Sequence, residues 1–172
     1  MRARRGTTLV ELLTVVGLVA LLAALVALPG YRAFSAARAA GGAATTLAED
    51  LGMLESSAHN GSFQQGATLE IESIEPFAYS CYRGRPRTLD PQSTLGPLIV
   101  QRSFPGVRLS GGPLNVSTPL LFASNGSAQY ASAGHIAPQH QTIAVVLTAS
   151  ADPTRTVTTR LDLFTGAVTL GD

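Results

Sequence analysis

The sequence predicts an α+β protein in which a long N-terminal helix packs on a C-terminal antiparallel β-sheet. Three observations lead to this fold class. An uncharged stretch of 20 residues runs from Leu12 to Tyr31. Small and leucine side chains then recur at helical spacing as far as Ala58. From Asn60 onward, short runs of alternating apolar and polar residues are separated by turn residues, which is typical of strands, and such segregation of helix and strands along the chain defines the α+β class.

The composition limits the chain to one modest domain with an appendage. It has 172 residues, of which 13% are charged, against the usual share of about 25%. Because 45% of the residues are hydrophobic, an intrinsically disordered or highly charged solvating chain is excluded. The formal charge of +1 gives no overall basic excess of the kind that marks nucleic-acid binders. Cys81 is the only cysteine, so no intramolecular disulfide forms.

The apolar stretch predicts a membrane-spanning helix over Thr7 to Leu28. Such a helix would be roughly 33 Å long, against about 30 Å of bilayer hydrocarbon. Three arginines precede it, at positions 2, 4 and 5. The preference for basic residues on the cytoplasmic side therefore predicts residues 1–6 inside and the globular part of the chain outside.

Glu11 is the one charged residue within the apolar segment. A carboxylate in the bilayer costs about 2.5 to 3.5 kcal/mol at the centre and less near a helix end. Pairing with a cation at the same depth would offset that cost, and a free α-amino group made by cleavage just upstream would serve. The alternative is a carboxylate that only stabilises the start of its own helix, worth about 0.3 to 1 kcal/mol.

The run from Arg4 to Leu13, RRGTTLVELL, resembles the type III signal of type IV pilins and type II secretion pseudopilins. The resemblance implies that a membrane prepilin peptidase cleaves after Gly6 and N-methylates the new N-terminal residue, Thr7. It also implies that Glu11 is the fifth residue of the mature chain and meets the N-terminal amine of a neighbouring subunit. Thr7 stands where the family usually has Phe or Met.

The resemblance implies a structural subunit, a minor pilin or pseudopilin, of a type IV pilus or a type II secretion filament. Its partners would be prepilin peptidase, other pilin or pseudopilin subunits and the inner membrane. The chain would be a single-pass protein of the bacterial inner membrane and then part of an extracytoplasmic filament. It would be neither an enzyme nor bound to a cofactor. The expected organisation is a leader over residues 1–6, a transmembrane and assembly helix over 7–28, its amphipathic continuation over 29–59 and a β-rich domain over 60–172.

An ordinary signal peptide or membrane anchor is the alternative for the N-terminal segment. A secretory signal has a basic start, an apolar stretch of about 7 to 15 residues and a small-residue cleavage site. Ala33, Phe34 and Ser35 before Ala36 form a site of that type. The apolar stretch here is longer, and this alternative leaves Glu11 unexplained.

The chain after the apolar stretch divides into an amphipathic helix and a series of strands. The helix has one apolar stripe, and Pro29 and Gly30 predict a kink where it begins. The stripe comprises Ala33, Ala37, Ala40, Ala44, Leu47, Leu51, Leu54 and Ala58. The strands are expected at Leu69–Glu72, Phe77–Tyr82, Leu98–Ser103, Val107–Ser110, Leu120–Ser124, Ile143–Leu147 and Arg160–Leu163. Asn125-Gly126 and Thr165-Gly166 predict tight turns.

Three of these segments resemble the C-terminal half of the GspH/FimT group of pseudopilins and minor pilins. They are Leu120–Ser127, Ile143–Leu147 and Leu161–Leu170, and the last contains Phe164-Thr165-Gly166. In the FimT branch, basic residues near the C-terminus are linked to DNA binding. The closing segment here, Thr165–Asp172, has no basic residue, so the resemblance does not extend that activity to this chain.

Arg83, Arg85 and Arg87 form the one basic cluster of the β-rich region. Alternate residues of an extended chain point the same way, so the three guanidinium groups could contact DNA or another polyanion, as in a tip or competence pilin. A solvated surface loop is the alternative, and Pro86 and the overall charge favour it.

No metal site or catalytic constellation is predicted. His135 and His140 are only two possible ligands, whereas zinc sites need three or four. Cys81 is expected to be a small buried core residue rather than a nucleophile.

Overall fold

One helix and two antiparallel sheets make up the computed structural model, which describes residues 8–61, 63, 65–86, 95–132, 135–136 and 141–171. The helix α1 runs from Leu9 to His59. The chain divides into two units, Met1–Ser35 and Ala36–Asp172. The C-terminal part of α1 therefore belongs to the same unit as both sheets.

The N-terminal unit contains the first half of α1. Leucine, valine and alanine dominate this half, and its large apolar side chains from Leu9 to Leu22 are exposed. Within the described residues, no helical stretch combines the length and the hydropathy needed to cross a membrane. The predicted transmembrane helix and the single-pass inner-membrane placement are corrected on this finding.

Sheet A, the larger sheet, forms the first β layer of the C-terminal unit. Its strand order is β3-β2-β1-β5-β6-β7 and its paired strands are antiparallel. Leu69 and Ile71 of β1 are buried while Glu72 is exposed, as the alternation in the sequence predicts. The strands are β1 (Ala67–Ser73), β2 (Phe77–Arg83), β3 (Leu98–Phe104), β5 (Leu120–Phe122), β6 (Ala128–Ser132) and β7 (His135–Ile136).

Sheet B, the smaller sheet, has the strand order β10-β9-β8-β4 and is also antiparallel. Ile143, Val145 and Leu147 of β8 are buried, as expected from their alternation. The strands are β4 (Val107–Gly111), β8 (Thr142–Ala149), β9 (Asp152–Asp162) and β10 (Val168–Gly171). The expected strands are confirmed to within about two residues at their ends, except that the one at Arg160–Leu163 is only the end of the longer β9.

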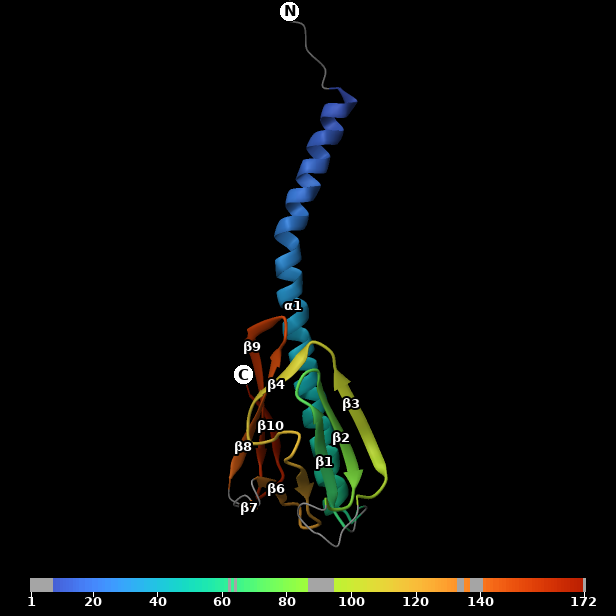
Figure 1. Ribbon diagram of the computed structural model, residues 1–172, viewed down its shortest axis with the longest axis vertical. Helices are drawn as coiled ribbons and strands as arrows, with labels where there is room; N and C mark the ends of the chain where they lie inside the picture. Colours follow the sequence, from blue (N-terminus) through green and yellow to red (C-terminus); the bar gives the residue numbers. More distant parts are fainter. Residues whose placement is uncertain are drawn as a thin grey trace, which may run out of the picture. The chain divides into compact units, whose positions relative to one another are not determined.

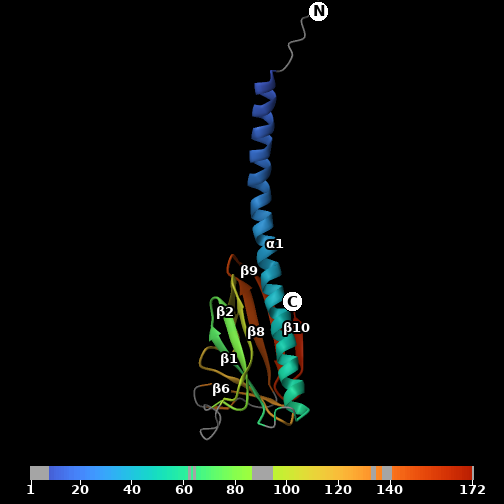
Figure 2. The same ribbon diagram turned by 90° about the vertical axis from the view of Figure 1, so that its right-hand side faces the viewer.

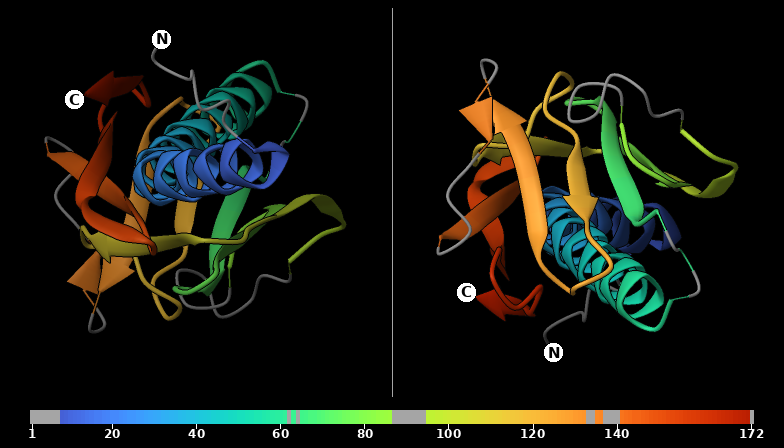
Figure 3. Two further views of the ribbon diagram at one scale, coloured as in Figure 1. Left: turned by 90° about the horizontal axis from the view of Figure 1, so that it is seen from above. Right: turned by 90° about the horizontal axis from the view of Figure 1, so that it is seen from below.

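The part of α1 from Ala36 to His59 shares one hydrophobic core with the inner faces of both sheets. Figures 1 and 2 show the strands of the two sheets on different sides of this part of the helix, and Figure 3 shows the same arrangement from both ends. Because two sheets cover the helix, its buried surface is wider than the predicted stripe. Ala36, Ala43 and Asp50 are buried beside that stripe.

The predicted pilin-like fold, a half-transmembrane helix packed on one antiparallel sheet, is therefore wrong. The strands form two sheets rather than one, and no helix of the described residues has the length and apolar character needed to cross a membrane. The sequence pattern located β1 to β5, β8 and the end of β9, but it missed β6, β7 and β10 and could not assign the strands to sheets. Pairing of β4 with β8, for example, joins segments more than 30 residues apart, and alternation is a property of each strand alone.

Two hairpin turns, one from each sheet, lie against the last turns of α1. Gly126 follows Asn125, whose side-chain oxygen accepts a hydrogen bond from the Ser127 backbone amide at 3.1 Å. Gly166 lies in the turn between β9 and β10 and has a φ of 72°. A Cβ atom at Gly166 would lie 2.6 Å from Glu55 Cγ and 2.6 Å from the Gly126 carbonyl oxygen. Both turns predicted from the sequence are confirmed, and their glycines leave room for the helix.

We expect Gly166→Ala to destabilise the protein by more than Gly106→Ala. Gly106 has a φ of 76°, but a Cβ atom there would meet no other atom within 4 Å, so alanine costs only the left-handed backbone, about 1 to 2 kcal/mol. Gly166→Ala adds a clash with backbone. Urea unfolding followed by circular dichroism measures both free energies of unfolding. Equal losses for the two variants would contradict the packing of this turn against Glu55.

Candidate functional site

Glu11 takes part in a capping box at the start of α1. The Thr8 backbone amide donates a hydrogen bond to Glu11 Oε2 at 2.9 Å. In return, the Glu11 amide donates to Thr8 Oγ1 at 3.3 Å. This reciprocal pair satisfies two amides that a helix N-terminus otherwise leaves without partners. The signal for it in the sequence is Thr-x-x-Glu, which the apolar character of the segment obscured.

The predicted processing site precedes this cap. Gly6 and Thr7 lie outside the described residues. Glu11 is therefore the predicted site residue of the N-terminal segment that the structure places, and its carboxylate lies at the first turn of the helix. A carboxylate there is also favoured by the positive end of the helix dipole.

Apolar side chains surround this first part of α1 and face solvent. Ten large ones between positions 9 and 22 are each exposed by 55% or more. They are Leu9, Val10, Leu12, Leu13, Val15, Val16, Leu18, Val19, Leu21 and Leu22. The Thr14 hydroxyl, which lies in the same segment, donates to the Val10 carbonyl oxygen at 2.7 Å and so is satisfied within the helix. The segment can offer an almost purely apolar helix surface to another molecule.

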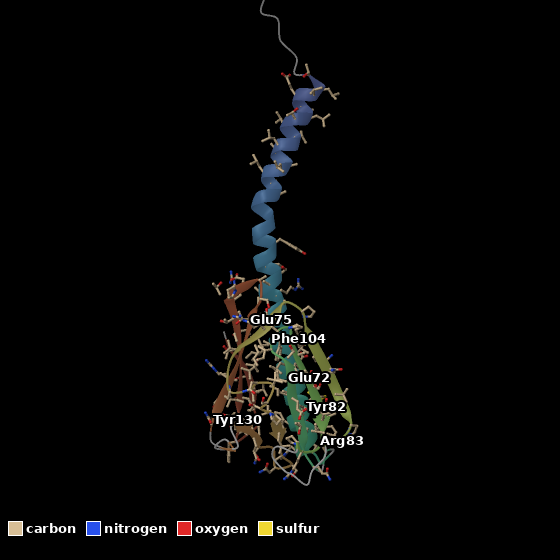
Figure 4. All side chains as sticks on the ribbon, in the orientation of Figure 1. Glu72, Glu75, Tyr82, Arg83, Phe104 and Tyr130 are labelled. Atoms are coloured by element: carbon tan, nitrogen blue, oxygen red, sulfur yellow. The ribbon has the colours of Figure 1, made fainter. Side chains whose placement is uncertain are left out.

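The arginine cluster is placed in part. Arg83 ends β2, where its guanidinium carbon lies 4.6 Å from the centre of the Phe63 ring, a cation–π distance. Arg85 follows it as an exposed residue, and Arg87 lies outside the described residues. Figure 4 shows Arg83 at the end of the strand. The cluster of three guanidinium groups therefore stays a prediction, with Arg83 and Arg85 as the two members that the structure places.

The histidines form no metal site among the residues that the structure describes, where no group of three His, Cys, Asp or Glu side chains is placed to hold an ion. His135 begins β7 and His140 lies outside the described residues. His59 is at the C-terminal end of α1, where the helix dipole favours a basic residue.

A buried polar centre that no pattern in the sequence predicted connects α1 with sheet A. Asp50 is 6% exposed, and its Oδ2 accepts a hydrogen bond from the Tyr79 hydroxyl at 2.8 Å. Arg102 binds both carboxylate oxygens, through Nε at 3.1 Å and Nη2 at 3.4 Å. Tyr79 and Arg102 are register partners on β2 and β3, so the pleat directs both toward the same residue of the helix.

Burial around this centre shifts two acidic groups. The pKa of Tyr79 is raised well above its ordinary value by burial first, and then by its hydrogen bond to Asp50. Burial likewise raises the pKa of the Cys81 thiol to about 12, with the Asp50 charge as a second cause. A thiol that stays protonated is a poor nucleophile. The expectation that Cys81 is a buried core residue is confirmed by its complete burial.

Comparison of the chain with protein-family models, curated proteins and solved structures gives no match. The resemblance to pilins and pseudopilins therefore rests on the residues of the N-terminal motif and of the C-terminal strands and turns.

We expect Asp50→Asn to lower the free energy of unfolding by about 1 to 3 kcal/mol, because the amide leaves the buried hydrogen bonds of Tyr79 and Arg102 partly unsatisfied. Glu49→Gln is the matched control, since Glu49 is the exposed neighbour on the same helix turn and such surface changes stay within about 0.5 kcal/mol. Urea titration measures both. If the two variants unfold alike, Asp50 does not hold α1 to the sheet.

Stability should fall with rising pH above pH 9.0. The unfolded Cys81 thiol loses its proton near 9.0, whereas the folded thiol keeps it until about 12, so the unfolded state binds fewer protons in that window. The resulting slope is at most about 1.4 kcal/mol per pH unit. Cys81→Ala should reduce the slope measured between pH 8 and pH 10, whatever its effect at neutral pH. An unchanged slope would show that Cys81 ionises normally in the folded protein.

Proposed function

We propose that this chain is a structural subunit of a filament, a minor pilin or pseudopilin of a type IV pilus or a type II secretion system. Prepilin peptidase would cut it after Gly6 and N-methylate Thr7, and the N-terminal part of α1 would assemble it with other subunits. The N-terminal motif supports the proposal through its resemblance to that family. One structural observation also supports the proposal, namely that the N-terminal part of α1 exposes a large apolar surface.

That surface is too apolar to be a solvated helix face. Full burial of a Leu or Val side chain contributes about 1.5 to 3 kcal/mol. The ten side chains between Leu9 and Leu22 are 55% to 76% exposed, so covering them would contribute roughly 9 to 18 kcal/mol. Soluble monomers rarely expose an apolar patch of this extent, and such patches mark interaction sites. Helices of neighbouring subunits would cover it on all sides.

Glu11 would supply the specificity that an apolar surface lacks. Its capping box with Thr8 holds the carboxylate at the helix start, and Thr8 is the next residue after Thr7, where cleavage after Gly6 would create an amine. An ammonium group from a neighbouring subunit can pair with this carboxylate, and a charge pair among apolar helices fixes register because misaligned charges are costly.

The capping box dictates how the proposal is tested. Glu11→Ala removes both the charge and the cap, whereas Glu11→Gln keeps the cap, because glutamine serves equally in a capping box. In cells with a prepilin peptidase, we expect the wild-type N-terminal peptide to begin at N-methylated Thr7. We expect Glu11→Gln to be processed and folded, yet to fall several-fold in the assembled fraction.

Mass spectrometry of the N-terminal peptide and the amount of sheared, sedimentable protein are the two measurements. A chain that begins at Met1 or at Ala36 would overturn the proposal in favour of an anchor or a secreted domain. Wild-type assembly of Glu11→Gln would overturn the role of the Glu11 charge while leaving processing intact.

A further inference from the structure

The outer faces of the two sheets carry opposite charges. Each sheet turns one face to the common core around α1, so its other face points away from that core (Figure 3). On sheet A the charged residues of the outer face are Glu70 and Glu72 of β1. On sheet B they include Arg108 of β4 and both Arg160 and Asp162 of β9, so two arginines against one aspartate leave this face basic.

The charged residues on the face of sheet A are acidic. Glu70 is the register partner of Ser80, and the Tyr82 hydroxyl is 3.5 Å from Glu72 Oε1 (Figure 4). Burial raises the pKa of Glu70, and the charge of Glu72 is the second cause. Among the described residues, neither carboxylate forms an ion pair, and Glu75 adds a third exposed carboxylate in the turn that follows β1.

The face of sheet B is basic and rich in hydroxyl groups. Neither Arg108 nor Arg160 meets a carboxylate within the described part of the chain. The two nearby carboxylates have other partners, since Asp162 accepts hydrogen bonds from backbone amides of its turn and Asp152 pairs with Arg155. Arg160 extends over β10, because Gly171 has no side chain there and its Cβ position would be 3.4 Å from the guanidinium carbon.

We propose that the acidic outer face of sheet A in one copy of this chain binds the basic outer face of sheet B in the next copy. Two different faces of one domain meet in such a contact, so it is heterologous, and a heterologous contact that does not close into a ring propagates as a helical filament. The inference rests on the proposed function, because it names the contact between globular parts in that filament.

The two faces are too small to hold two copies together without a second contact between the same copies. The four strands of sheet B, about seven residues long on average and spaced by about 4.8 Å, give a face of about 450 Å². On sheet A, Thr68 and Ser80 of the outer face are already buried, so a contact of the two faces buries less than about 900 Å² in total, below the standard size of about 1,600 Å². It would form only where the N-terminal helices already hold the copies together and raise their effective concentration.

Charge reversal in the full-length chain tests the contact. Glu72→Arg and Arg160→Glu each place like charges opposite one another, so each variant should lower the sedimentable fraction several-fold, and more strongly at low salt because exposed charges are screened by ions. The double variant restores opposite charges with exchanged signs. We expect it to recover assembly to near the wild-type amount.

Arg83→Glu is the matched control, since it makes the same change of charge at the end of β2 beside Phe63 and should assemble like the wild type. Single reversals without effect would overturn the inference, and so would a double variant that stays as low as the singles. Failure of the wild-type chain itself to assemble would instead refute the proposed function.

Crosslinking gives a second measurement that does not depend on assembly yield. Cys81 is buried and its raised pKa keeps it unreactive, so introduced thiols report alone. A mixture of Glu72→Cys and Arg160→Cys chains, treated with a short thiol-specific crosslinker, should give linked dimers, whereas either variant alone should not. Links within one variant alone would indicate a symmetric contact and overturn the head-to-tail arrangement.

Discussion

The hydrogen-bonded ion pair of Asp50 with Arg102 is the interaction on which the C-terminal unit depends. It is the point where α1, β2 and β3 meet through polar groups, since Tyr79 also donates to the same carboxylate. An edge strand such as β3 has unsatisfied backbone groups on one side and is the part of a sheet most prone to incorrect pairing. Arg102 anchors it from within, and the stacked rings of Phe77 and Phe104 pack beside this anchor. A buried carboxylate is costly unless it is fully hydrogen-bonded, and this one has three donors.

The helix that carries Asp50, α1, has different surroundings in its two halves. From Ala36 onward one side of the helix is buried against both sheets, and the opposite side is exposed. Between Leu9 and Leu22 its large apolar side chains are exposed. At the C-terminal end of the helix, Glu55 and His59 lie against two turns, where Gly126 and Gly166 have no side chains and so leave room for them. The sequence of α1 therefore changes along the helix, from a surface that is apolar on all sides to one with a buried side and an exposed side.

Local sequence patterns predicted much of this structure, but they could not predict which strands pair with each other. Alternation located β1, β8 and the end of β9, and Asn125-Gly126 located a turn, because each signal lies within a few residues. The segment from Asp152 to Thr159 gave no such signal, since threonine occupies the buried position 159 as well as the exposed positions 154 and 156, so most of β9 was missed. Asp50 looked like an ordinary charged residue of a helix. Only the register of Tyr79 with Arg102, which lie 23 positions apart on consecutive strands, shows why it is buried.

The capping box changes the meaning of Glu11 more than any other structural finding. An acidic residue near the start of an apolar helix suggests a search for a cation elsewhere, yet Thr8 shows that the carboxylate is already bound within its own chain. The two roles are compatible because a carboxylate has about four lone-pair sites and the Thr8 amide uses one. Local capping fixes where the charge lies, and a charge with a fixed position can select one arrangement among the many that apolar surfaces allow. The neighbouring copies would then be close enough for the weaker contact between their oppositely charged sheets.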